Sequence, residues 1–102
     1  MSMEVFLTSL IGRIYKILPL FEDTSRGDEV FVGEYIDSLL MELKGATRTF
    51  PRLGRSPKYI NIVNTVHYMN ACLEKVTLFQ CRREIFKMIA FVEDMKGGDF
   101  GA

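Results

Sequence analysis

The chain has 102 residues and a mass of 11.7 kDa, which is the size of a single domain and excludes a multidomain enzyme. Hydrophobic residues make up 48% of the sequence, enough to build a core, and this excludes an intrinsically disordered protein. Thirteen Lys and Arg residues balance thirteen Asp and Glu residues, and this zero net charge excludes a uniformly basic, histone-like protein.

The first predicted element is an amphipathic helix from about Met3 to Leu18. Apolar residues recur in this segment every three or four positions, whereas Ser9 and Arg13 share the opposite side. The apolar face is broad, and Pro19 and the residues after it break the pattern.

A polar run at residues 22–27 predicts a turn, in which Ser25 or Asp28 caps a second helix. Apolar residues at helical spacing continue this helix to Lys44. Gly45 follows as a C-terminal stop, so we expect the helix to end there.

Residues 46–56 show neither a helical period nor strand alternation, which predicts a loop of about a dozen residues. Long loops of this kind are often functional. Ser56 is a good N-cap, and Pro57 suits the first position of a third helix, because that position needs no backbone N–H donor.

Residues 58–96 contain neither Gly nor Pro, yet their apolar stripe changes phase near residue 77. A shift of two residues turns the stripe by about 200° around the helix, so one straight helix in a monomeric bundle cannot bury it. Thr77 and Gln80 have the spacing of a capping box, which predicts a break there and a fourth helix from about Leu78 to Met95.

These elements predict an all-α, up-down four-helix bundle that forms one domain over residues 1–96. Gly97 and Gly98 predict the end of the last helix, and residues 97–102 a flexible C-terminal tail. The alternative is three helices, with one long C-terminal helix packed in an oligomer.

Residues that catalyse reactions are sparse. His67 is the one histidine, and no Asp, Glu or Cys stands three or four positions from it to complete a helical metal site. Glycine-rich phosphate loops and strained nucleophile turns are also missing from the sequence. We therefore expect no enzyme activity, no metal and no cofactor.

Charge is unevenly divided along the chain. Residues 1–42 contain three basic and eight acidic residues, whereas residues 43–102 contain ten basic and five acidic ones. Five cations fall within residues 44–58, with Phe50 between them and Tyr59 directly after the last, which is typical of a single-stranded nucleic-acid site. Alternatively, these cations pair with the acidic first half, or with an acidic protein partner. The candidate binding residues are Lys44, Arg48, Phe50, Arg52, Arg55 and Lys58.

Two of the expected helices carry more apolar surface than a small bundle can hide. Helices that are apolar on two sides need neighbours on both, and four short helices cannot all be central. We therefore predict a homo-oligomer whose interface includes Phe6, Leu10, Ile14, Phe86 and Ile89.

The sequence favours a non-enzymatic helical protein that self-associates and binds a larger macromolecular partner, as an adaptor, regulator or inhibitor does. The alternative is a nucleic-acid-binding accessory protein that uses residues 44–58. We expect a protein partner before a nucleic acid, and no membrane binding. Two cysteines are too few for a disulfide framework, and charges interrupt the apolar N-terminal segment, so we expect a cytoplasmic setting without a secretory signal.

Overall fold

The first predicted helix is present, but it is interrupted at Lys16. The computed structural model describes residues 2–23 and 29–99 of the chain. In it, α1 spans Met3–Tyr15, with Ser2 as its N-cap, and α2 spans Ile17–Asp23. Pro19 does not end the helix as predicted: it lies in the first turn of α2. Because proline has no N–H for the Tyr15 carbonyl four residues earlier, the helix breaks after Tyr15 and restarts at once.

The second predicted helix runs further than expected. It is α3, which spans Glu29–Thr49, so the prediction that it ends at Lys44 is wrong. Gly45 is exposed in mid-helix, and a side chain there would meet nothing within 4 Å. The helix continues because the next residue, Ala46, packs against the core, and its carbonyl accepts a hydrogen bond from the Phe50 N–H one turn later. The predicted caps Ser25 and Asp28 lie outside the described residues.

The prediction of a loop at residues 46–56 is wrong. Residues 46–49 belong to α3, and a 3-10 helix, η2, spans Pro51–Arg55, because Leu53 is completely buried and holds this segment against the core. Ser56 then caps α4 (Pro57–Ala71) by accepting the Tyr59 N–H, which confirms the predicted helix start.

The predicted break between the last two helices is confirmed. A short 3-10 turn, η3 (Leu73–Lys75), follows α4, and α5 spans Leu78–Asp94. Thr77 and Gln80 form the reciprocal capping box. The alternative of one long C-terminal helix is therefore wrong. Past α5, a π-helical turn, η4 (Met95–Asp99), includes both glycines of the predicted tail, and residues 100–102 lie outside the described part.

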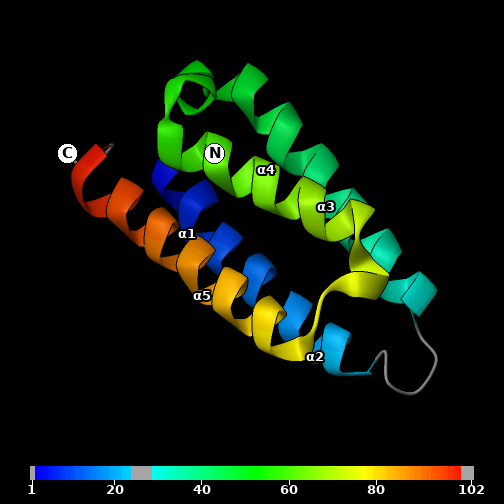
Figure 1. Cartoon of the computed structure of the whole chain (residues 1–102). Helices are drawn as coiled ribbons and strands as arrows, with labels where there is room; N and C mark the ends of the chain where they lie inside the picture. The colour runs from blue at the N-terminus through cyan, green and yellow to red at the C-terminus, as the bar shows by residue number, and fades with distance from the viewer. Residues whose placement is uncertain (1, 24–28, 100–102) are drawn as a thin grey trace.

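The described helices form an all-α four-helix bundle if α1 and α2 count as one interrupted helix. Successive helices run in alternating directions, with α1 beside α5 and α3 beside α4 (Figure 1). The start of α1, η2 and the end of α5 meet at one end of the bundle, and α2, the start of α3 and η3 meet at the other (Figure 1). The molecule measures 44 × 22 × 20 Å.

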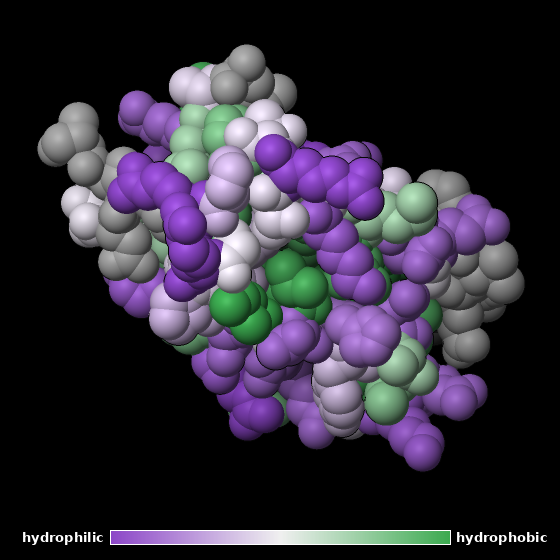
Figure 2. Space-filling view, turned by 90° about the horizontal axis from the view of Figure 1, so that it is seen from above, coloured by the Kyte–Doolittle hydropathy of each residue, from purple (hydrophilic) through white to green (hydrophobic). Residues whose placement is uncertain are grey.

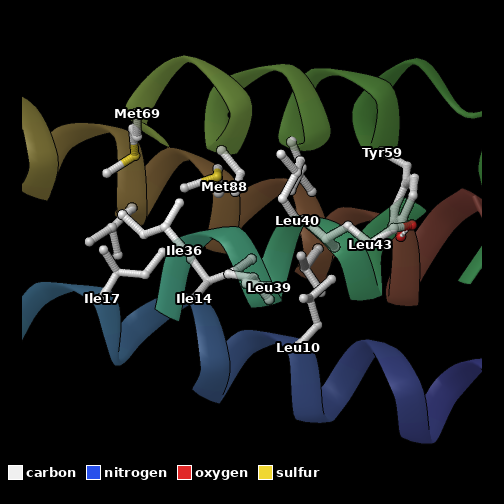
Figure 3. Packing of buried hydrophobic residues seen from close by; sticks show 14 of the residues in the cluster. Leu10, Ile14, Ile17, Ile36, Leu39, Leu40, Leu43, Tyr59, Met69 and Met88 are labelled. Carbon is white, nitrogen blue, oxygen red and sulfur yellow. Dashed lines mark hydrogen bonds between the residues drawn. The ribbon is translucent and has the colours of Figure 1, made fainter. Parts of the chain in front are cut away.

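The core runs along the bundle axis. On α1, Leu10 and Ile14 lie on the side that faces Leu39 and Ile36 of α3 (Figure 3). At the η2 end, the Tyr59 ring is buried, and its hydroxyl donates a hydrogen bond to the Leu43 carbonyl.

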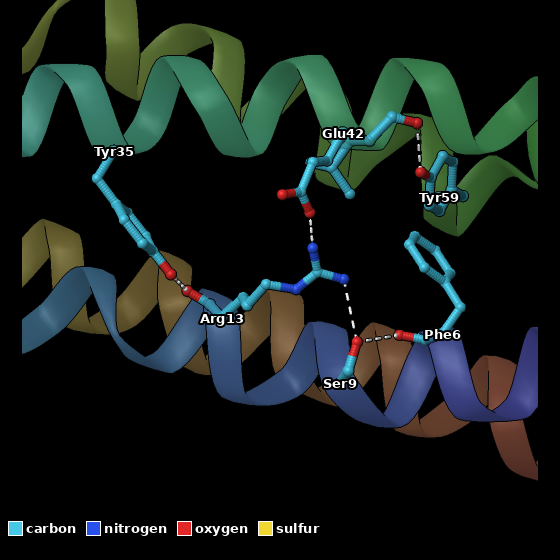
Figure 4. Close-up of polar contacts among 7 residues, drawn as sticks. Phe6, Ser9, Arg13, Tyr35, Glu42 and Tyr59 are labelled. Atoms are coloured by element: carbon cyan, nitrogen blue, oxygen red, sulfur yellow. Dashed lines mark hydrogen bonds and ion pairs between the residues drawn. The ribbon is translucent and has the colours of Figure 1, made fainter. Parts of the chain in front are cut away.

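A polar contact ties α1 to α3 outside the core. The Arg13 guanidinium forms an ion pair with Glu42 and donates to the Ser9 hydroxyl at 3.0 Å (Figure 4). The Tyr35 hydroxyl donates to the Arg13 carbonyl at 2.8 Å. The Glu42 carboxylate, which belongs to the acidic first half of the chain, therefore pairs with a cation of the same half.

Candidate interaction surfaces

Three residues of the predicted oligomer interface belong to the core of the protomer instead. Phe6, Leu10 and Ile14 are buried, so their part of the interface prediction is wrong. Helix α1 is covered on both sides of its apolar face, because it packs beside α5 and its core side chains also reach α3. The broad apolar face therefore reflects two neighbours within one chain.

The other two residues of that prediction lie on α5 and are accessible. Phe86 is 50% exposed, and Ile89 is partly buried at the edge of the core. The ring of Phe86 meets the ring of Tyr15 on α1 edge to face, with 6.4 Å between centroids. Phe79, seven residues before Phe86 and so on the same side of α5, is 73% exposed. We call Tyr15, Phe79, Phe86 and Ala90 the aromatic face.

Charges are segregated along the aromatic face. On α5, Arg82 lies between Phe79 and Phe86, whereas Glu93 follows one turn after Ala90. Both charged side chains are exposed. The face therefore has a positive half toward the start of α5 and a negative half toward its end, with the small Ala90 between Phe86 and the acid.

The predicted binding segment 44–58 is brought together at one end of the bundle. Lys44 and Arg48 lie on the last turns of α3, Arg52 and Arg55 on η2, and Lys58 on the first turn of α4. The view from above shows strongly hydrophilic residues on the surface beside weakly polar and apolar ones (Figure 2). We call these five cations the basic end.

Three of the five cations of the basic end are not paired with the acidic first half of the chain: in the described part of the structure, Lys44, Arg48 and Arg55 form no ion pair. Lys58 Nζ lies 4.0 Å from an Asp94 carboxylate oxygen of α5. Phe50, the aromatic member of the predicted site, is half-buried, and its ring packs 5.8 Å from the ring of Phe6. Part of this ring is therefore taken up by packing within the bundle.

A pocket that the sequence analysis missed lies between α4 and α5. Its volume is about 290 Å³. Arg83 and Glu84 in its wall lie 3.8 Å apart and carry opposite charges. A row of polar residues every three or four positions on α4 was the sequence signal for it. The lining residues are Asn61, Asn64, Thr65, Tyr68, Met69, Val76, Gln80, Arg83 and Glu84.

Groups suited to catalysis are not gathered in the described part of the chain. The Cys81 thiol is buried, and desolvation, with a smaller contribution from Glu22, raises its pKa to about 11. At neutral pH this thiol is protonated and a poor nucleophile. His67 is exposed on α4, and no three His, Cys, Asp or Glu residues among those described lie close enough to hold a metal ion.

None of the described helices combines the length and apolar character needed to cross a lipid bilayer. Comparisons of the chain with models of known protein families, with curated proteins and with solved structures found no significant match. The surfaces described above are therefore the basis for inferring what the protein does.

Proposed function

We propose that this chain is a non-enzymatic interaction module that forms a homodimer through the aromatic face and, as a dimer, binds a larger partner. The observation that carries the proposal is the exposure of Phe79 and Phe86 on one side of α5, at 73% and 50%. Burying a phenylalanine side chain stabilises a contact by about 2 kcal/mol. Exposed large apolar groups that cluster in this way mark interaction sites.

Charge complementarity favours a second copy of the chain as the occupant. A two-fold axis through the middle of α5 places two α5 helices antiparallel, so that Arg82 of one copy faces Glu93 of the other. The same axis places Phe86 against Ala90 of the second copy, whose small side chain leaves room for a ring. Each copy thus matches its positive half to the negative half of its mate.

The size of the face indicates a weak dimer. Seventeen residues of α5 extend about 26 Å at 1.5 Å per residue. Two adjacent helices are about 20 Å wide, so each copy contributes about 500 Å². The total of about 1,000 Å² is near the lower limit for a specific interface, which implies dissociation constants in the micromolar range.

The cysteine thiols and the residues of the pocket support a binding protein that catalyses no reaction. Both cysteines are free, which suits the cytoplasmic setting that we include in the proposal. The protonated Cys81 thiol and the opposed charges of Arg83 and Glu84 leave no activated nucleophile among the groups described above.

Light scattering between about 5 and about 500 µM tests the dimer, because this range spans the expected dissociation constant. We expect the mass to rise with concentration from 11.7 kDa toward twice that value. Phe86→Ser should hold the protein at the monomer mass. Met41→Ser is the matched control, because Met41 is 68% exposed on α3, outside the aromatic face, and this variant should dimerise like the wild type.

A charge exchange tests the two-fold arrangement itself. Arg82→Glu should weaken the dimer about tenfold by placing two carboxylates opposite each other, and adding Glu93→Arg should restore it. A wild-type protein that stays monomeric over the whole range, or a double variant as weak as the single one, contradicts this proposal.

A further inference from the structure

The basic end lies within the longest stretch of the chain without an acidic residue. No Asp or Glu occurs between Glu42 and Glu74, and the five cations fall within the first half of that stretch. In the structure this stretch turns at η2, so the cations come from three consecutive elements, α3, η2 and α4, at one corner of the bundle (Figure 1). The corner therefore concentrates five cations, and Asp94 of α5 lies 4.0 Å from one of them, Lys58.

The basic end has no exposed aromatic anchor among the described residues. The exposed apolar side chains that border it are Met41, one turn before Lys44 on α3, and Ile60, two residues after Lys58 on α4, whereas the exposed aromatic side chains lie elsewhere. Interfaces between proteins obtain most of their binding energy from a few buried anchors, among which aromatic side chains are prominent. Binding to nucleic-acid phosphates needs no such anchor, because it is driven by the release of counterions from the polyanion. The chemistry of this corner therefore favours nucleic acid over an acidic protein.

The two aromatic residues within or directly after residues 44–58, both in the described part of the chain, are engaged in packing. Phe50 packs against Phe6, and Tyr59 is buried, with its hydroxyl bonded to the Leu43 carbonyl. Sites for single strands combine cations with exposed aromatic rings. Cations without exposed rings contact the phosphates and do not distinguish one base from another.

The corner that carries the cations is held rigidly. Leu53 is buried beneath η2, its N–H donates to the Phe50 carbonyl at 2.9 Å, and its carbonyl accepts the Ser56 N–H at 3.1 Å. Three of the five cations are arginines, whose planar guanidinium groups bind phosphate through two parallel hydrogen bonds. A rigid base reduces the entropy lost when these side chains bind.

From these observations we infer that the basic end binds the phosphate backbone of double-stranded nucleic acid, without sequence preference. Lys44, Arg48, Arg52, Arg55 and Lys58 contact phosphates in this inference. It does not depend on the aromatic face, because the two surfaces share no residue.

Fluorescence anisotropy with a labelled DNA duplex of about 20 base pairs tests this inference across a range of salt concentrations. Five phosphate contacts predict a plot of log affinity against log salt concentration with a slope of about −4. Changing Arg48, Arg52 and Arg55 together to Gln should lower affinity at least tenfold and bring the slope to about −2. Two duplexes of unrelated sequence should bind equally.

The matched control removes three charges elsewhere. Lys16, Lys75 and Lys87 are exposed on other elements, and changing all three to Gln should alter duplex affinity less than twofold. Circular dichroism and thermal unfolding establish that both triple variants are folded. Binding by the monomeric Phe86→Ser variant separates this inference from the dimer, because each monomer keeps one basic end.

Four outcomes overturn the inference. One is equal loss of affinity in the two triple variants, which assigns the binding to net charge alone. Another is a single strand of the same charge that binds tenfold more tightly than the duplex, which requires base stacking. A third is binding of polyglutamate without binding of the duplex, which makes the corner a site for an acidic protein. The last is a wild-type protein that binds neither probe at low salt.

Discussion

The two corners that precede α4 and α5 are built alike but anchored differently. Each consists of a 3-10 turn followed by a helix with a hydroxyl N-cap: η2 leads to Ser56, and η3 leads to Thr77. In the first corner Leu53 and Ser56 are buried, and Tyr59 ties α4 to the Leu43 carbonyl of α3. In the second corner η3 has no buried residue.

The second corner relies on contacts at its surface. Leu73 is partly buried and lies across Gly33 of α3, where an added Cβ would be 3.8 Å from Leu73 Cδ2. The capping box of Thr77 and Gln80 is exposed. A corner anchored in the core can hold five like charges near each other, whereas one held by local hydrogen bonds gains little from tertiary packing. The proposed nucleic-acid contacts lie on the anchored corner.

The largest expected difference between the corners concerns their leucines. Leu53→Ala leaves a cavity in the core and should lower the free energy of unfolding by about 3 kcal/mol. Leu73→Ala removes a side chain that is partly in water already and should cost about 1 kcal/mol. Urea unfolding at neutral pH measures both values. Equal losses in the two variants contradict the distinction between the corners.

Each corner is followed by a buried group that can lose a proton at alkaline pH: the Tyr59 phenol after the first corner and the Cys81 thiol after the second. Burial raises the pKa of the Cys81 thiol from 9.0 to about 11, and it raises the pKa of the Tyr59 phenol from 10.0. Between pH 9.0 and about 11 the unfolded chain loses the Cys81 proton while the folded protein keeps it. The free energy of unfolding should therefore fall over this interval, by on the order of 2 kcal/mol.

Urea unfolding as a function of pH measures this fall, and Cys81→Ala is the control. The variant should be less stable than the wild type at neutral pH, yet lose less stability between pH 9.0 and 10.0, where the phenols of the unfolded chain, with an ordinary pKa of 10.0, are at most half ionised. Identical pH profiles for the two proteins would assign the alkaline loss to other groups.

The smallest expected difference lies in the two N-caps. Ser56→Ala should lower the free energy of unfolding by about 1.5 kcal/mol, because it leaves the buried Tyr59 N–H without its acceptor. Thr77→Ala should cost about 0.7 kcal/mol, since water can replace the exposed cap. Thermal unfolding of the two variants tests the order, and a larger loss for Thr77→Ala contradicts it.

Local signals predicted the helix boundaries that depend on a few neighbouring residues. Ser56 with Pro57, and Thr77 with Gln80, were recognised as helix starts because a cap needs only atoms within one turn. The break before α5 also followed from the change of phase in the apolar stripe. The continuation of α3 through Gly45 could not be predicted in this way, because a glycine is tolerated in a helix whose next turn packs against the core.

Composition and periodicity by themselves determined that this chain is an all-α bundle with a basic segment at residues 44–58, because amphipathic spacing and charge are properties of neighbouring residues. Only the tertiary structure decided which apolar surface remains accessible: Phe6, Leu10 and Ile14 are covered within the protomer, whereas Phe79 and Phe86 are exposed. It also decided that Leu53 turns the expected loop into an ordered corner. The physical reason is that burial depends on which helices become neighbours, and residues distant in the chain set that arrangement together.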